Sequence, residues 1–322
     1  MSLRGYFVRR VLQMVPVILA VILITFALLQ LAPGDVATLM AGEDANPEVI
    51  AAIRDRYQLD APLGEQFVAY VGSLVQGDLG TSIRYGQPVI DVILSRVPAT
   101  LLLVGTALLA ATLLGTTSGT LLARRIGSRL DAFASFVAIG AFSVPVFWLG
   151  LMLILIFAVN LHWLPSSGMT SAIAPRDPIG RMMDVLAHLI LPAVTLATVW
   201  FGQYLRLARS SVASVLGEDY ITAARATGFS ERRILMHHAL RNALLPVVTV
   251  FGLQLGVVLA GAVLTETVFS WPGLGRLIYE AILARDIPLI VGSYLVMSVM
   301  VAIASLVTDL AYARLDPRVE YR

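Results

Sequence analysis

Cysteine and lysine are both missing from this chain of 322 residues. Without cysteine, the chain cannot form a disulfide framework, a thiolate metal site or a cysteine nucleophile. Without lysine, it can carry neither a phosphate-binding loop of the GxxxxGK[ST] type nor a lysine Schiff base. All 23 basic residues are therefore arginine. If nucleotide hydrolysis drives the process in which this chain takes part, the ATPase is another polypeptide.

Charge of either sign is also scarce. Only 14% of the residues are charged and 58% are hydrophobic, and the mean hydropathy is +0.83. Soluble domains contain about 25% charged residues. This composition indicates an integral membrane protein.

Six apolar runs approach the ~20 residues that a helix needs to cross a bilayer. They cover residues 11–31, 99–122, 133–159, 187–206, 244–265 and 288–312. The first run follows three arginines, as in a signal peptide, but its apolar core exceeds the usual ~7–15 residues. We therefore expect an uncleaved span and predict an all-α membrane protein with six transmembrane helices.

The arginines predict the orientation of these helices. If both termini lie inside, the inner segments hold 15 arginines and the outer segments hold eight. Basic residues in short loops accumulate on the cytoplasmic side. The predicted topology is therefore N-in and C-in.

Three parts follow from this order. Residues 1–31 form the N-terminal helix, residues 32–97 a small extracytoplasmic helical subdomain, and residues 98–322 a core of five transmembrane helices. Asn46 and Pro47 mark a helix start in the subdomain, and a second amphipathic helix covers about 63–75. With nine acids and four arginines, the subdomain is either a solvated acidic cap or a docking surface for a soluble partner.

The polar interval Glu218–Pro246 interrupts the apolar pattern on the inner side. It reads as two short helices, because Gly228 can adopt the left-handed conformation that ends the first and Ser230 can cap the second. Tyr220, Ile221 and Ala224 fall on one face of the first helix, and Ile234, Leu235 and Ala239 form an apolar face on the second. Such an elbow either lies on anionic headgroups or offers a rigid knob to a cytoplasmic motor, and its small residues favour the knob.

Other chemistry finds little support. The adjacent His237 and His238 diverge by about 100° on a helix and do not form a ligand pair. No GxSxG nucleophile elbow occurs, so we predict no catalytic and no metal site. Glu266 is an ionisable residue at the outer end of a predicted span, and with Trp271 it is our candidate for a gate or outer pathway.

Several motifs carry a resemblance to a known family. The run TAARATG (Thr222–Gly228) resembles the EAA–G loop of permease subunits of binding-protein-dependent ABC importers. The surrounding DYITAARATG, HHALRNALLP, TETVFSWPGLGRL and DLAYARLDPRVEY are similar to the dipeptide/oligopeptide/nickel branch, as are GDLGTSIRYGQP and LHWLPSSGM. Thr222 stands where the general motif has glutamate, so a contact specific to that glutamate does not carry over.

The resemblance implies a type I ABC importer permease fold with a cytoplasmic coupling loop at 207–243. It implies that this loop contacts the ATPase through a set of polar and small residues: Asp219, Tyr220, Thr222, Ala223, Ala224, Arg225, Gly228, Arg232 and Arg233. The implied partners are a second homologous permease, two cytoplasmic ATPase subunits or one fused ATPase, and an extracytoplasmic solute-binding protein. ATP and Mg²⁺ would bind to the ATPases, and no cofactor would bind to this chain.

The expected function is therefore that of a permease subunit for di- and oligopeptides in the bacterial cytoplasmic membrane. A permease for nickel or another small solute is the alternative within the same branch. A secondary transporter driven by an ion gradient is a second class, although few carboxylates fall inside the predicted spans. A membrane anchor without a passage is a third.

Overall fold

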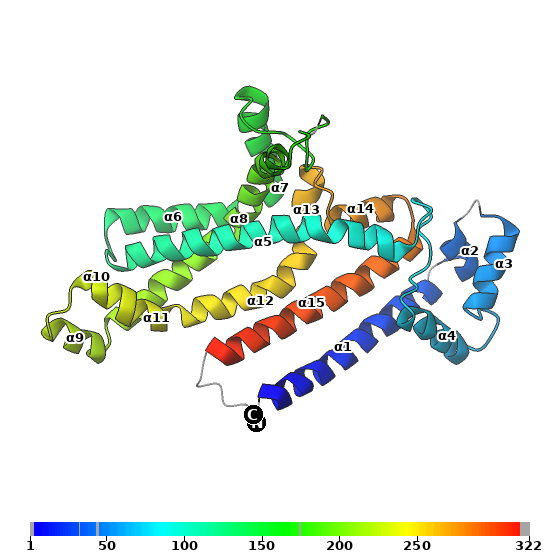
Figure 1. Ribbon diagram of the computed structural model, residues 1–322, viewed down its shortest axis with the longest axis horizontal. Helices are drawn as coiled ribbons and strands as arrows, with labels where there is room; N and C mark the ends of the chain where they lie inside the picture. The colour runs from blue at the N-terminus through cyan, green and yellow to red at the C-terminus, as the bar shows by residue number, and fades with distance from the viewer. Residues whose placement is uncertain (1–2, 32, 43–44, 174, 316–322) are drawn as a thin grey trace. The chain divides into compact units, whose positions relative to one another are not determined.

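The computed structural model describes residues 3–31, 33–42, 45–173 and 175–315, and these residues form helices and connecting loops (Figure 1). No strand is present in these ranges, apart from one isolated bridge between Thr81 and Pro88. The all-α prediction is confirmed. The chain divides into two compact units, one from residues 1–100 and 272–306 and the other from residues 101–271 and the described residues after 306.

The first unit holds the predicted extracytoplasmic subdomain. Its helices are α1 (Leu3–Leu31), α2 (Val36–Ala41), α3 (Pro47–Arg56), α4 (Leu63–Val75), the start of α5 (Val89–Ala123), α14 (Leu274–Leu283) and most of α15 (Ile287–Leu315). The predicted start of α3 is confirmed, because the side chain of Asn46 accepts a hydrogen bond from the backbone N–H of Glu48. The predicted second helix is α4.

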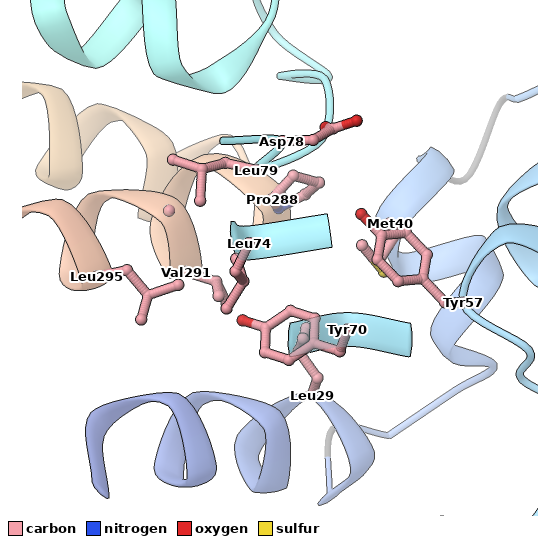
Figure 2. A pocket seen from close by; sticks show the side chains of 11 residues that line it. Leu29, Met40, Tyr57, Tyr70, Leu74, Asp78, Leu79, Pro288, Val291 and Leu295 are labelled. Carbon is pink, nitrogen blue, oxygen red and sulfur yellow. The ribbon is translucent and has the colours of Figure 1, made fainter. Parts of the chain in front are cut away.

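A tyrosine cluster joins these subdomain helices. Leu29 of α1, Met40 of α2, Tyr57 after α3 and Tyr70 of α4 are buried together. The side chain of Gln66 donates to the backbone oxygens of Leu59 and Ala61 and accepts a 2.6 Å hydrogen bond from Gln30. The cluster borders a cavity of about 10 Å³ (Figure 2), which is close to the smallest space that holds one water molecule.

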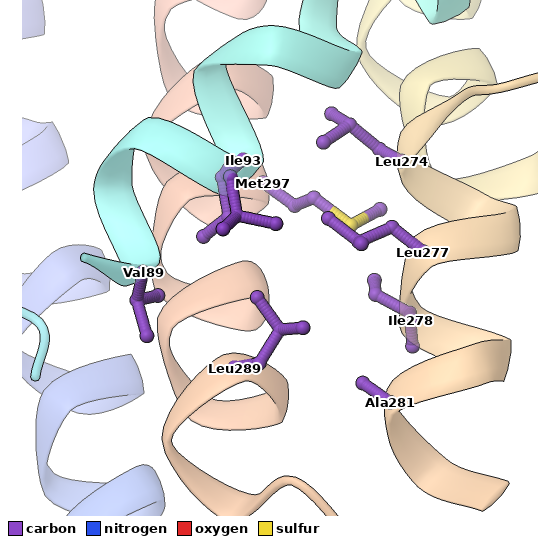
Figure 3. Packing of buried hydrophobic residues seen from close by; sticks show 9 residues of the cluster. Val89, Ile93, Leu274, Leu277, Ile278, Ala281, Leu289 and Met297 are labelled. Carbon is purple, nitrogen blue, oxygen red and sulfur yellow. The ribbon is translucent and has the colours of Figure 1, made fainter. Parts of the chain in front are cut away.

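A second apolar cluster packs α5, α14 and α15 together. Val89 and Ile93 of α5 lie against Leu274, Leu277, Ile278 and Ala281 of α14 and against Leu289 and Met297 of α15 (Figure 3). The buried carboxylate of Asp286 accepts hydrogen bonds from the Ser82 hydroxyl and from the backbone N–H groups of Arg84 and Leu289. These three bonds satisfy the carboxylate and fasten the segment before α5 to the start of α15.

The second unit contains the predicted coupling loop. Its helices are the rest of α5, then α6 (Arg129–Ser143), α7 (Val146–Leu153), η1 (Ile154–Asn160), α8 (Pro178–Leu216), α9 (Asp219–Ala226), α10 (Glu231–Arg233), η2 (Ile234–Ala239), α11 (Leu240–Ala243), α12 (Leu245–Gly261), α13 (Val263–Val268) and the end of α15. Helix α8 continues ten residues beyond the predicted span 187–206, so the first part of the 207–243 loop is helical.

The predicted third span does not form one helix. Residues 133–159 are divided among α6, α7 and η1. The break falls at Val144, which is extended (φ −82°, ψ 127°), because the ring of the following Pro145 disfavours the helical conformation there.

Four described helices are long and apolar enough to cross a membrane: Phe7–Leu31, Val89–Ala123, Pro178–Leu216 and Ile287–Leu310. A fifth is present if Glu231–Ala243 and Leu245–Gln254, which meet at 45°, form one bent span. The count of six and the N-in, C-in topology stay predictions.

Glycines bring the helices of the second unit close together. On α5, a Cβ atom at Gly115 would lie 2.9 Å from the backbone oxygen of Phe201 on α8, and one at Gly119 would overlap that of Leu205. On α8, a Cβ atom at Gly202 would lie 2.7 Å from the backbone oxygen of Ala138 on α6. Small residues at four-residue spacing permit this approach in membrane helices, so α8 packs tightly between α5 and α6.

Candidate coupling surface

The predicted elbow is present as α9, α10, η2 and α11, and Figure 1 shows it at the end of α8 away from α7. Ile221 and Ala224 of α9 point inward and pack with a set of buried side chains: Ala123, Val212, Ile234, Leu235, Ala239 and Ala243. Ile221 and Ile234 are fully buried. Burying such a side chain contributes about 1.5–3 kcal/mol, so this cluster seats the elbow firmly on α5 and α8.

Gly228 ends α9 in the predicted conformation. Its φ is +84°, in the left-handed region that glycine enters without a steric penalty. Its N–H donates to the backbone oxygen of Arg225, and the N–H of Phe229 donates to that of Ala224. These two bonds close the helix end and turn the chain toward α10.

Side-chain bonds hold the two arms of the elbow together. Ser230 caps α10 by accepting from the N–H of Arg233, as predicted. The Arg225 guanidinium reaches across the glycine turn and donates to the Glu231 carboxylate at 2.9 Å. The Tyr220 hydroxyl donates to the backbone oxygen of His238 at 3.3 Å and accepts from Asn242 at 3.1 Å. The arms are thus joined on both sides of the turn.

Tyr220→Phe is expected to loosen α9, because it removes two hydrogen bonds that are each worth about 0.5–1.5 kcal/mol. Amide hydrogen exchange in residues 219–226 should become faster. Tyr279→Phe on α14 is the matched control, since both tyrosines are 43% exposed and the Tyr279 hydroxyl makes no hydrogen bond in the described part of the chain. Unchanged exchange in α9 would contradict a bracing role for Tyr220.

The outward face of the elbow combines small, basic and aromatic groups. Among the residues implied by the resemblance, Asp219, Tyr220, Thr222, Ala223, Arg225, Gly228, Arg232 and Arg233 are exposed, whereas Ala224 is buried. The ring of Phe229 stacks on His238 at 5.4 Å, and the Arg233 guanidinium lies 4.7 Å from the Phe229 ring centre. Sequence reasoning missed Phe229, which is 37% exposed, and the only available signal was its place directly after Gly228.

A second missed feature is an ion pair between half-buried Arg209 and buried Asp131. Arg209 of α8 donates two hydrogen bonds to the Asp131 carboxylate at 2.5 and 2.6 Å, and the backbone N–H of Gly127 donates a third. Asp131 is 4% exposed. The hydrogen bonds from Arg209, followed by that from Gly127, hold the pKa of Asp131 below its usual range. This two-pronged ion pair joins the start of α6 to the C-terminal half of α8.

The lowered pKa predicts a pH effect. A carboxyl whose pKa is lower in the folded state stabilises it above the unfolded pKa, about 3.9 for aspartate. That stability is lost as the pH falls through the folded pKa. Asp131→Asn should therefore lower the melting temperature at pH 7, and its deficit against the parent should shrink below about pH 4. The exposed Asp55→Asn is the control, and a deficit that does not change with pH would contradict this account.

Glu266 lies in α13, and Trp271 lies in the turn that follows this helix. Both side chains are fully buried, and the N–H of Trp271 donates to the backbone oxygen of Glu266 at 2.8 Å. Both side chains are therefore enclosed by the packing of this chain, and their role in a gate or outer pathway stays a prediction. Within the described ranges, no group of three or more His, Cys, Asp or Glu side chains could hold a metal ion.

Comparison with known proteins agrees with this architecture. Residues 115–321 match the family described as "Binding-protein-dependent transport system inner membrane component", and residues 3–104 match its N-terminal companion. A chain of the MetNI methionine ABC transporter has a similar fold, with a TM-score of 0.56 and 17% identity over 70% of this chain and 97% of that one. This similarity supports the type I importer permease fold.

Relatives align over almost their whole length. The di/tripeptide transport system permease protein DppB of Pseudomonas aeruginosa (strain UCBPP-PA14) is 41% identical over 99% of both chains. The oligopeptide transport system permease protein AppB of Bacillus subtilis (strain 168) is 39% identical over 98% of this chain and 99% of its own. The glutathione transport system permease protein GsiC of Escherichia coli O6:H1 is 38% identical over 99% of both chains. The chain therefore belongs to the inner membrane components of binding-protein-dependent transport systems and is a transport permease.

Proposed function

We propose that the chain forms half of the translocation pathway of an ATP-driven importer and receives the motion of the ATPases through the α9–α10 elbow. The rigid attachment of this elbow carries the proposal. Its apolar side is seated on α5 and α8, and its two arms are joined by the Arg225–Glu231 ion pair and the Tyr220 hydrogen bonds. An elbow attached in this way would move as a rigid body with the C-terminal end of α8.

The proposed partners follow from the family. They are a second homologous permease, two ATPase subunits or one fused ATPase, and an extracytoplasmic binding protein. ATP and Mg²⁺ bind to the ATPases, in keeping with the absence of lysine from this chain. Closure of the ATPases would draw the elbows together and bias the permeases between inward- and outward-facing states.

The proposed cargo is a short peptide. The three relatives named above carry di/tripeptide, oligopeptide and glutathione in their names at nearly equal identity to this chain. These solutes differ in length and side chains, and they share peptide amides and a terminal carboxylate. A pathway that contacts these common groups would accept all of them.

The test is ATP hydrolysis by the complete complex in nanodiscs. Binding protein loaded with a short peptide should stimulate hydrolysis above the rate with empty binding protein. Purification of this chain should also bring the ATPase subunits with it. A stable, ATPase-free protein that moves solute down an ion gradient would instead identify a secondary transporter and overturn the proposal.

A further inference from the structure

Helix α8 has one open side in its C-terminal half. Gly202 lies against Ala138 of α6, and Tyr204 and Leu205 lie against the glycines of α5. The half-buried or exposed side chains on this stretch include Gln203, Arg206, Ser210 and Ser214. Their spacing of three, four and four residues puts them on one helical face. Two residues of this polar face, Gln203 and Arg206, fall within the predicted apolar span 187–206.

Helix α12 contributes one further polar group to this face. The Gln254 amide donates a 3.1 Å hydrogen bond to the Gln203 side-chain oxygen. The neighbouring Gly252 faces the other way, since its backbone oxygen accepts from the Thr308 hydroxyl of α15. The two glutamines therefore meet at a seam between α8 and α12, 51 residues apart in the chain.

This pair is only partly satisfied. A glutamine amide offers two donors and one oxygen acceptor, and neither side chain makes another hydrogen bond in the described part of the chain. One N–H₂ group and one amide oxygen remain available, and both glutamines are half-buried. Exposing such groups to hydrocarbon is unfavourable.

Other outward faces of the same unit have the character that lipid requires. The exposed side chains of α5 include Leu109, Leu113 and Leu121, and those of α6 include Phe133 and Phe136. Lipid therefore fits the α5–α6 side, whereas the α8–α12 seam needs water or a polar ligand.

We infer that Gln203 and Gln254 line the passage and bind the backbone amides of the peptide as it crosses. A peptide bond presents one N–H donor and one C=O acceptor, which complement the free oxygen and the free N–H₂ of the glutamine pair. Contact with the backbone alone is independent of side-chain identity. The inference rests on the proposed function, because it assigns residues to the pathway of that importer.

The absence of cysteine permits a direct test. In the complete complex, Gln254→Cys supplies the single thiol of this chain, and Leu113→Cys supplies a control on α5, where the leucine is 63% exposed. A charged, membrane-impermeant methanethiosulfonate should label Gln254→Cys at least about tenfold faster, because the reactive species is the hydrated thiolate. Binding protein loaded with the dipeptide Ala-Ala should slow this labelling. Mass spectrometry of this chain measures both effects.

Uptake of Ala-Ala into proteoliposomes provides the second measurement. At saturating loaded binding protein, Gln203→Leu and Gln254→Leu should each lower the uptake rate about five- to tenfold, the change expected for one lost neutral hydrogen bond. Gln30→Leu is the matched control, because Gln30 pairs with Gln66 in the first unit through the same amide–amide bond. Its uptake rate should stay at the parental value.

Each other outcome identifies what failed. If Gln254→Cys is labelled as slowly as Leu113→Cys while loaded binding protein still stimulates ATP hydrolysis, the passage assignment is wrong and the importer stands. Rapid labelling that Ala-Ala does not slow would overturn the peptide contact. If Ala-Ala stimulates no hydrolysis in the unaltered complex, the proposed function itself fails.

Discussion

Replacing Gly228 with valine is expected to lower peptide transport by on the order of 100-fold, the cost of a small misplacement of a group that must engage its partner. Gly228 has φ +84°, a conformation that β-branched residues adopt only with strain. Valine would therefore change the backbone dihedral angles between α9 and α10, alter the direction of the chain there and displace the ring of Phe229. A Cβ atom at this position meets nothing within 4 Å, so the effect comes from backbone conformation and not from a clash.

The membrane part of the protein should tolerate this change. Gly228→Val should insert into the membrane normally, and the complex should hydrolyse ATP without moving peptide. Gly217→Val is the matched control, because Gly217 ends α8 near the same elbow with an ordinary φ of −88°. The measurement is the ratio of peptide transported to ATP hydrolysed. Full transport by Gly228→Val would count against the coupling role of the elbow.

Gly119→Leu is expected to have the largest effect on folding. A Cβ atom at Gly119 would overlap the backbone oxygen of Leu205 and lie 2.9 Å from the backbone nitrogen of Arg209. Because these are backbone atoms, no change of side-chain rotamer can relieve the overlap. The helices α5 and α8 must therefore move apart. Overpacking typically costs about 1–3 kcal/mol and occasionally more, and separation would also disturb the Asp131–Arg209 ion pair on the same stretch of α8.

The control for this prediction lies on the same helix. A Cβ atom at Gly105 meets nothing within 4 Å, so Gly105→Leu should leave the melting temperature of the detergent-solubilised protein close to the parental value. Gly119→Leu should lower it by several degrees or prevent accumulation of the folded protein. Equal melting temperatures for the two variants would show that α5 and α8 do not make this close approach.

Much of the elbow could be predicted because its signals are local. A glycine between two short amphipathic segments and a serine three residues before Arg233 specify a turn and a cap within one or two helical turns. The apolar spacing of Ile221, Ala224 and Ile234 likewise predicted which side would be buried, whereas Tyr220, predicted on the same face as Ile221, is 43% exposed because its hydroxyl bonds to the other arm. The stacking of Phe229 on His238 was missed, because it depends on how the two arms fold back on each other.

The span boundaries were less predictable. The apolar run 133–159 contains no charge, so its composition predicted one continuous helix, and the conformational preference of the residue before Pro145 divides it instead. The run 187–206 was too short at both ends, because segments of mixed polar and apolar residues continue α8 from Pro178 to Leu216. Hydropathy indicates which residues are favourable in lipid. It does not indicate where the backbone hydrogen bonds of a helix begin and end.

By itself, the sequence determined that this protein is a helical membrane permease without the lysine of a GxxxxGK[ST] loop, because composition, missing residue types and ordered motifs need no knowledge of packing. Only the tertiary structure decided which polar groups meet. Asp131 and Arg209 are 78 residues apart, and Gln203 and Gln254 are 51 apart. In spans that are apolar on almost every side, periodicity does not distinguish a face that touches lipid from one that touches another helix. Contacts between distant segments depend on the close crossings that glycines permit, and these appear only when the helices are packed.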